Sequence, residues 1–197
     1  RAAQRPDEQR GVVYSFGSRG DDLFGRRVLQ LAPGCEVHIF DRSAPVRPAP
    51  RGGSGPYART ARYHCRYLTA DNASSLSTYM RQLGHDYLDV LKVDIEGTEW
   101  DVFPGIDWPR ARIGQIQVEI HPARPRSTVG HVDALIATLE TAGYRVISIE
   151  PVGFPPSDAG SQPVEAVFLH RAWTPWGFAR SGRAASGKLA PPHSPYF

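Results

Sequence analysis

The 197-residue sequence contains little cysteine and no long apolar run, and each shortage limits what the protein can be. Cys35 and Cys65 allow at most one disulfide, and both lie in or beside strand-like runs. Because free cysteine commonly behaves as a small buried apolar residue, we expect two buried free thiols. No apolar stretch approaches the roughly 20 residues of a membrane-spanning helix, and no signal-peptide pattern is present. Since the sequence starts at Arg1 without Met, an upstream targeting or anchoring segment stays open, and so does the compartment.

Net charge is also small. The formal charge of +3 at pH 7 is spread without a long basic block through the central part of the sequence. A nucleic-acid-binding domain normally shows a much stronger basic patch or stripe. We therefore expect no nucleic-acid partner.

Apolar residues, glycine and proline are plentiful. A hydrophobic content of 41% is enough for a globular core, and 19 glycines with 18 prolines indicate substantial loops or tails. The length fits one domain rather than two. We expect a linker or frayed start over residues 1–10, one domain over 11–172 with a surface insertion at 43–60, and a flexible basic tail over 173–197.

The stretch from Leu88 to Phe103, LDVLKVDIEGTEWDVF, is the centre of the sequence. It begins as an apolar, β-branched strand and ends in acids beside a glycine, which suits a parallel sheet whose ligands bind beyond the carboxyl ends of the strands. In an extended strand Asp94 and Glu96 would point to the same side and line a pocket. The alternative is that one caps the next helix and the other pairs with Lys92.

Strands and helices alternate along the first two thirds of the sequence. Helical spacing predicts helices around Phe24–Leu31, Leu76–Leu83 and Val132–Leu139, which end at Pro33-Gly34, Gly84 and Gly143. Asp71, Asn72 or Ser74 is expected to cap the second helix. The expected strands lie at residues 12–16, 36–41, 61–68, 88–95, 113–121, 144–149 and 164–169. About seven strands in this order predict a doubly wound α/β sheet whose last two strands pair as an antiparallel hairpin.

Two features near the first two strands suggest a nucleotide-like ligand. Glycines in the turn Phe16-Gly17-Ser18-Arg19-Gly20-Asp21 would let the backbone approach a ligand closely. Their G-x-x-G spacing is weaker evidence for a nucleotide-binding turn than G-x-G-x-x-G would be. The alternative is an ordinary turn between a strand and a helix. Asp41 lies about 20 residues further on, at the end of the second strand, where an acid can accept the hydroxyls of a ribose. A turn-initiating aspartate is the alternative there.

Glu119 and His121 stand two residues apart at the end of the strand after Asp94. Because neighbouring strands are about 4.8 Å apart, these three side chains can converge. Such a group could hold a divalent cation, or His121 could act as a general base. The alternative is that His121-Pro122 only turns the chain. The remaining histidines are expected at the surface or in incidental packing: His38, His64, His85, His131 and His170.

The segments GVVYSFGSRGDDLF, CEVHIFD, MRQLGH and LKVDIEGTEWDVF resemble the FkbM-related methyltransferase domain, in animal proteins of the methyltransferase-like protein 24 type. The resemblance covers roughly residues 11–170. It implies a Rossmann-like class I methyltransferase fold, a mostly parallel seven-stranded sheet with an antiparallel last strand, and S-adenosylmethionine as cofactor. It further implies that Phe16, Gly17, Ser18 and Gly20 approach the methionine part of the cofactor and Asp41 its ribose. It also places Asp94 and Glu96 near the transferred methyl.

The resulting hypothesis is O-methylation of a small molecule or glycan-like acceptor. Asp94, Glu96 or His121 would handle the hydroxyl proton. No metal is assigned to the site, although Asp94, Glu119 and His121 are the candidate ligands for one, and metal dependence is left open. The oligomeric state is left open. One rival is a non-catalytic binding module, which the weak glycine turn favours. The other is an NAD-dependent oxidoreductase, against which the lack of G-x-G-x-x-G and the terminal strand pair argue. A nucleic-acid methyltransferase is disfavoured because no Asn/Asp-Pro-Pro-Tyr motif follows the fourth strand.

Overall fold

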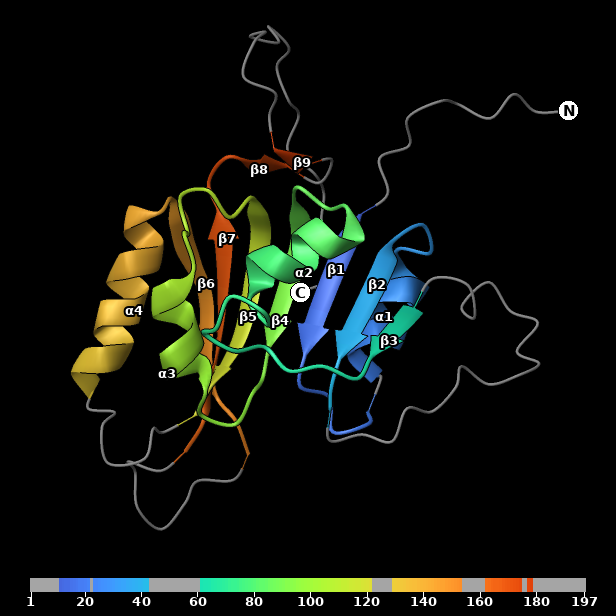
Figure 1. The fold of residues 1–197 in the computed structure, drawn as a ribbon. Coiled ribbons are helices and arrows are strands. Elements are labelled where there is room, and N and C mark those ends of the chain that lie inside the picture. The colour runs from blue at the N-terminus through green and yellow to red at the C-terminus, as the bar shows by residue number, and fades with distance from the viewer. Residues whose placement is uncertain are drawn as a thin grey trace, which may run out of the picture.

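Short apolar runs of the sequence form the strands of one large sheet (Figure 1). A computed structural model describes residues 11–21, 23–42, 61–121, 129–153, 162–174 and 177–178. The insertion expected at 43–60, the start at 1–10 and most of the tail therefore lie outside the described residues. The strands of the sheet are β1 (Val12–Phe16), β2 (Glu36–Phe40), β3 (Ala61–His64), β4 (Leu88–Val93), β5 (Ile113–Ile120), β6 (Tyr144–Pro151) and β7 (Val164–His170).

The strand order is β3-β2-β1-β4-β5-β7-β6. β7 runs antiparallel to both β5 and β6, and the other neighbouring pairs are parallel. In Figure 1 the arrowheads of β1 and β2 point to the lower edge of the sheet, whereas that of β7 points upward. The doubly wound, mostly parallel, seven-stranded sheet with an antiparallel last strand is confirmed. The chain order reverses between β1 and β4, which makes the carboxyl edge there the expected ligand crevice.

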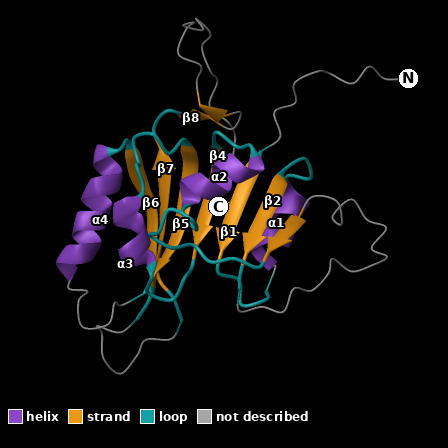
Figure 2. Cartoon of the chain, viewed as in Figure 1, coloured by secondary structure: helices purple, strands orange, loops and turns teal. Residues whose placement is uncertain are grey.

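Helices cover both faces of the sheet (Figure 2). α1 (Leu23–Leu31) lies on one face and packs Leu29 against Val37 and Ile39. The other face carries α2 (Leu76–Leu83), α3 (Glu99–Val102), the short helix η2 (Phe103–Gly105) and α4 (Val129–Thr141). In the described part of the chain, no helix is long and apolar enough to cross a bilayer.

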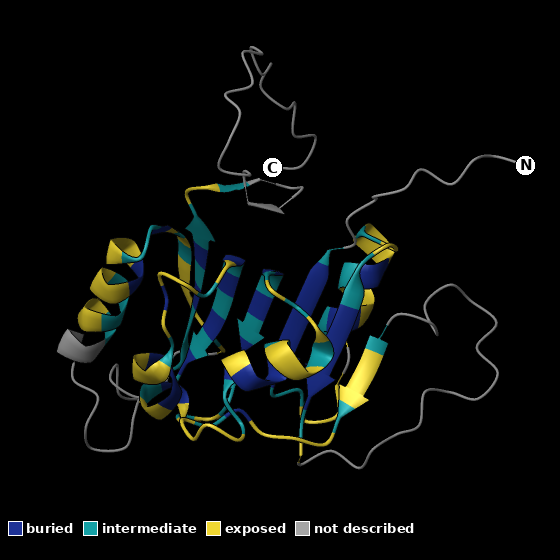
Figure 3. Cartoon of the chain, turned by 45° about the horizontal axis from the view of Figure 1, so that its top comes forward, coloured by how far each residue is buried: buried dark blue, intermediate teal, exposed yellow. Residues whose placement is uncertain are grey.

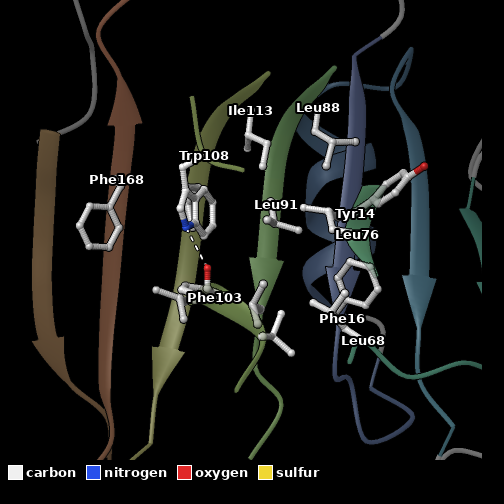
Figure 4. Close-up of a cluster of buried hydrophobic side chains, with 14 of the residues drawn as sticks. Tyr14, Phe16, Leu68, Leu76, Leu88, Leu91, Phe103, Trp108, Ile113 and Phe168 are labelled. Carbon is white, nitrogen blue, oxygen red and sulfur yellow. Dashed lines mark hydrogen bonds between the residues drawn. The ribbon is translucent and has the colours of Figure 1, made fainter. Parts of the chain in front are cut away.

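The main core lies between the sheet and this second group of helices (Figure 4). Tyr14, Leu91 and Phe168 are fully buried on three different strands. The Trp108 indole N–H donates to the Phe103 carbonyl at 3.1 Å, so the turn into β5 satisfies its buried polar group. Figure 3 shows the strands at the centre of the sheet buried and much of β3 and of the outer side of α4 exposed. The carboxyl edge is thus the end of a well-packed sheet.

Several local expectations about element boundaries were wrong. Ser75, and not Asp71, Asn72 or Ser74, is the N-cap of α2, and its hydroxyl accepts the N–H of Thr78 at 3.3 Å. Asp71 instead accepts the N–H groups of Ala73 and Ser74 in the preceding turn. Gly84 ends α2 with φ 78°, as expected. The third strand stops at His64, four residues before the expected Leu68.

Two further expectations changed at the chain's periphery. Cys35 and Cys65 are free, as expected, but Cys65 is exposed and Cys35 only half-buried. The segment from Trp173, expected to lack secondary structure, begins with a two-stranded sheet of β8 (Trp173–Thr174) and β9 (Gly177–Phe178). Its anchor is the Trp173 indole, which packs where a side chain on Gly114 would otherwise lie and donates to Asp89 at 3.3 Å.

Candidate functional site at the carboxyl edge

The turn after β1 is built around a glycine that no other residue can replace without strain. Gly17 has φ 79°, and a Cβ atom there would lie 1.6 Å from the backbone carbonyl oxygen of Asp94. The backbone of this turn is fixed on both sides. Gly17 N–H donates to the Phe40 carbonyl at 3.0 Å, and Asp94 N–H donates to the Phe16 carbonyl at 2.9 Å. Three carboxyl-edge turns are therefore joined by main-chain hydrogen bonds.

Asp41, at the end of β2, holds the glycine turn in place. One of its carboxylate oxygens accepts the backbone N–H of Ser18 at 2.8 Å and the Ser18 hydroxyl at 3.0 Å. The Ser18 hydroxyl oxygen in turn accepts the N–H of Gly20 at 3.3 Å. The expected cofactor residues Gly17, Ser18, Gly20 and Asp41 thus form one connected unit. Their contact with a cofactor stays a prediction.

The chain after β4 does not continue as a strand. Glu96 has φ 60° and Gly97 has φ 94°, both in the left-handed region. The expectation that Asp94 and Glu96 lie on one side of an extended strand was therefore wrong, because β4 ends at Val93 and a turn follows. Both side chains nevertheless reach the same place through this turn. Glu96 also forms an ion pair with Arg19 of the glycine turn.

His121, directly after β5, is surrounded by four carboxylates. Its Nδ1 lies 3.0 Å from Oε1 of Glu99. Its Nε2 lies 3.6 Å from Oε2 of Glu96, 3.6 Å from Oε1 of Glu119 and 3.8 Å from Oδ1 of Asp94. We call Asp94, Glu96, Glu99, Glu119 and His121 the carboxylate–histidine cluster. The predicted convergence of Asp94, Glu119 and His121 is confirmed, since their ligand atoms all lie within 4.8 Å of one another.

Glu99 is the member of the cluster that the sequence did not assign. Its side chain is 1% exposed, and one carboxylate oxygen accepts both the N–H of Ile95 at 2.9 Å and the His121 hydrogen bond. The other oxygen, Oε2, has no hydrogen-bond partner among the described residues. A signal was available in the sequence, because an acid in the first turn of a helix often bonds back to a preceding N–H. The contact with His121 depended on the tertiary fold.

The electrostatics of the cluster favour added positive charge. Burial, and then the nearby Asp94 carboxylate, raises the pKa of Glu119. Lys92 supplies one compensating contact, with its ammonium 3.3 Å from Asp94. Both acids that the sequence analysis placed in a pocket thus also make ion pairs, Asp94 with Lys92 and Glu96 with Arg19.

A second group of histidines corrects the expectation that His38 is a surface or incidental residue. His38 is fully buried, and its Nε2–H donates to Glu36 at 2.9 Å. Because a neutral imidazole carries one N–H, the Nδ1 of His38 accepts from Nε2 of His64, also at 2.9 Å. His85 lies beside them, with its Nδ1 2.7 Å from the Tyr14 hydroxyl. These direct bonds form a structural network within the sheet face under α2.

This network predicts a pH dependence of stability. Burial lowers the pKa of His38 from 6.5 to about 4, although the Glu36 hydrogen bond offsets part of the effect. Between these values the unfolded chain binds more protons than the native chain, so the contribution of His38 is complete above pH 6.5 and is lost as the pH falls. We expect the free energy of unfolding to drop by about 2 kcal/mol from pH 7 to pH 5 through this group. Urea unfolding at the two pH values measures it.

The comparison variant for this prediction is His38→Leu, which removes the titrating group. It is expected to be less stable than the parent at pH 7, but its loss of stability between pH 7 and pH 5 should be smaller by the same amount. Equal losses in the two proteins would show that His38 does not titrate in this range.

A pocket of about 530 Å³ lies elsewhere in the molecule. It opens between the segment Phe103–Pro109 and the last turns of α4, including Thr138 and Thr141. It contains none of the residues expected to bind a cofactor or to act in catalysis. The candidate site is therefore defined by the carboxyl-edge turns and not by this pocket.

Comparison with known proteins identifies the family of the chain. A family model described as a methyltransferase domain matches residues 2–156. The probable methyltransferase-like protein 24 of Rattus norvegicus is 32% identical over 122 residues, which cover 55% of this chain and 32% of the rat protein. The Homo sapiens protein of the same name is 28% identical over 141 residues, which cover 63% of this chain and 36% of the human protein. The chain thus spans about a third of the length of these relatives.

The fold is also found among solved structures. A putative hemolysin from Streptococcus thermophilus is similar with a TM-score of 0.51 and 11% sequence identity, over 81% of this chain and 58% of that chain. At this level of identity the likeness concerns the fold alone.

Proposed function

Because the chain belongs to the methyltransferase-domain family, we propose that it transfers a methyl group from S-adenosylmethionine to a hydroxyl of a small-molecule or sugar-like acceptor. The observation that carries this proposal is the juxtaposition of two units at one edge of the sheet. The glycine turn with Asp41 forms the first, and the carboxylate–histidine cluster forms the second. The main-chain hydrogen bond from Asp94 N–H to the Phe16 carbonyl joins them at the reversal of strand order.

The residues of the glycine turn fit the proposed cofactor. The missing side chain at Gly17 lets the turn pack directly on the backbone of Asp94, which brings the ends of β1 and β4 together beneath the proposed cofactor. Asp41 ends the neighbouring strand and can accept hydrogen bonds from a ribose. When bound, S-adenosylmethionine supplies an electrophilic methyl group on a sulfonium sulfur.

The carboxylate–histidine cluster fits the other half of the reaction. A hydroxyl nucleophile must lose its proton as its oxygen attacks, and a positioned base accelerates such a step by about 10²–10⁴-fold. Asp94, Glu96 and His121 are the candidate proton acceptors. Glu99 is a positioning residue, because its bond to Nδ1 fixes the ring of His121 with Nε2 facing the other acids.

Calorimetry with S-adenosylhomocysteine tests the proposed function. We expect the isolated chain to bind it, and we expect Asp41→Ala to weaken binding by about 10–100-fold, since hydrogen bonds to charged groups contribute about 1.5–3 kcal/mol. Asp41→Asn keeps an acceptor for the Ser18 N–H, so the turn stays fixed, but it removes the charge that would bind the ribose hydroxyls. It therefore separates the two roles of Asp41. Asp86→Ala, which removes an exposed carboxylate paired with Arg112, is the control and should bind as the parent does.

The same titrations decide between the rivals. A folded chain with no affinity for S-adenosylhomocysteine or S-adenosylmethionine would be a non-catalytic module, and binding of NAD in their place would indicate an oxidoreductase. If Asp41→Ala and Asp86→Ala bind equally well, the role of Asp41 at the ribose is wrong. With an acceptor identified, unchanged turnover of Asp94→Ala would remove Asp94 from the mechanism.

A further inference from the structure

The Nε2 atom of His121 faces acidic oxygens across a gap that direct hydrogen bonds do not close. Since Nδ1–H donates to Glu99, a neutral His121 presents a lone pair at Nε2. The nearest oxygens of Glu96, Glu119 and Asp94 lie 3.6, 3.6 and 3.8 Å away. Hydrogen bonds from nitrogen to oxygen span about 2.7–3.2 Å. A lone pair and three carboxylates therefore face one another across this gap.

These separations suit ligands of one metal ion. Ligand atoms about 2.0–2.2 Å from a metal lie about 3–4 Å from one another in tetrahedral or octahedral geometry. Asp94, Glu119 and His121 each offer one ligand atom within 4.8 Å of the others. We propose that these three residues bind a divalent cation with a mixed nitrogen and oxygen preference, such as Mn²⁺ or Zn²⁺.

Glu99 provides an independent argument. A metal-bound histidine almost always donates its other ring N–H to a carboxylate, which fixes the ring and raises its basicity. Glu99 does this from a position that is 1% exposed, and its Oε2 has no hydrogen-bond partner among the described residues. A buried, half-satisfied carboxylate is costly unless positive charge lies close to it. A cation on Nε2 would place that charge on the far side of the same imidazole.

The charges around the cluster lead to the same site. Four carboxylates converge on His121, and among the described residues the two cationic side chains that contact them are Lys92 at Asp94 and Arg19 at Glu96. A divalent cation would offset the remaining negative charge. The group of Glu36, His38 and His85 differs, because His38 and Glu36 are in direct contact at 2.9 Å and bond each other without an ion.

The cation deepens the proposed function, and this part of the inference rests on it. A hydroxyl bound to a metal ion loses its proton more readily, so the cation would both hold the acceptor and activate it. Glu96 lies outside the three ligands, its side chain is 52% exposed, and its carboxylate can take the proton. The acceptor O–H bond breaks and the proton moves to Glu96. Transfer would then form the oxygen–methyl bond as the methyl–sulfur bond breaks, with S-adenosylhomocysteine as the leaving group.

Titration of the chelator-treated chain with MnCl₂, and separately with ZnCl₂, tests the site without any cofactor or acceptor. Calorimetry and the paramagnetic resonance signal of bound Mn²⁺ should reveal one site. Glu119→Gln and Asp94→Asn should each weaken binding by at least about tenfold. Glu99→Gln should weaken it by about 10–100-fold, because the carboxylate that orients the His121 ring and raises its basicity is lost. Asp86→Asn, at the opposite end of β4, is the matched control and should bind as the parent does. Thermal unfolding of each variant confirms that it is folded.

The outcomes are distinguishable from those of the proposed function. No binding of either metal by a chain that binds S-adenosylhomocysteine would overturn the cation site and leave methyl transfer standing. Metal binding that all the variants retain would place the ion elsewhere and also overturn the proposal. The parent chain could also bind metal but not S-adenosylhomocysteine, while Glu119→Gln loses the metal. That result would support the cation site and contradict the methyltransferase proposal.

Discussion

Gly17→Ala is expected to lower the free energy of unfolding by about 3 kcal/mol or more and to abolish binding of S-adenosylhomocysteine. A left-handed backbone costs a non-glycine residue about 1–2 kcal/mol. The larger effect is steric, since the new Cβ would lie 1.6 Å from the carbonyl oxygen of Asp94. That carbonyl belongs to backbone that is already bonded to β1 through Phe16, so neither chain can move away without breaking hydrogen bonds.

Gly84→Ala separates the two causes. Gly84 has nearly the same backbone angle, φ 78°, but a Cβ there would meet nothing within 4 Å. It should cost about 1 kcal/mol and leave binding of S-adenosylhomocysteine unchanged. Urea unfolding and calorimetry on both variants give the comparison. Equal losses of stability would mean that the close approach of Gly17 to Asp94 is unimportant.

His121→Ala is expected to lower methyl transfer by about 10²–10⁴-fold while the affinity for S-adenosylhomocysteine is retained. The side chain is 14% exposed and is the point on which all four carboxylates converge, so either proton transfer or cation binding fails without it. Turnover is measured by transfer of a labelled methyl group to an acceptor found by screening. Loss of cofactor affinity together with turnover would instead assign His121 to the cofactor side.

His170→Ala is the matched control for this variant. His170 ends β7, which runs opposite to β5, so it lies at the other edge of the sheet and packs edge-on against Tyr144. Its removal should leave turnover within the range of the parent. A comparable loss in both variants would indicate a general effect of removing a histidine on stability and would contradict a specific role for His121.

The architecture was accessible from the sequence because the strands are short apolar runs bounded by glycine, proline or acids. Leu88, Leu91 and Val93 mark β4 by their chemistry alone, and they are fully buried. The convergence of Asp94 with Glu119 and His121 was predictable for the same reason, since parallel neighbours end at one edge. Packing details were less accessible. Leu29 is buried on α1 while Leu31, which the helical spacing favoured, is 71% exposed.

Other parts of the site depended on tertiary structure. The left-handed backbone at Glu96 cannot be read from a residue that rarely adopts it, so the turn after β4 looked like a continuing strand. Glu99 gains its role from a histidine 22 residues away on another strand. His38 is a polar residue in an apolar strand, and its burial is tolerated because Glu36 and His64 satisfy both ring nitrogens.

The direct packing of Gly17 on the Asp94 backbone fixes the distance between the turn after β1 and the turn after β4. Groups held by long side chains vary in position as rotamers change, whereas main-chain atoms within a sheet hardly move. Here Asp94 N–H donates to the Phe16 carbonyl at 2.9 Å, which joins the turn beneath the proposed acceptor to β1, and Gly17 N–H donates to the Phe40 carbonyl at 3.0 Å, which ties the turn beneath the proposed methyl donor to β2. If the proposed donor and acceptor lie over these two turns, the spacing of adjacent strands sets the distance between them. In-line displacement slows markedly when the reacting groups are misplaced by about 1 Å. The backbone of the sheet can hold the two turns in position with this accuracy, without additional side chains that fix the substrate.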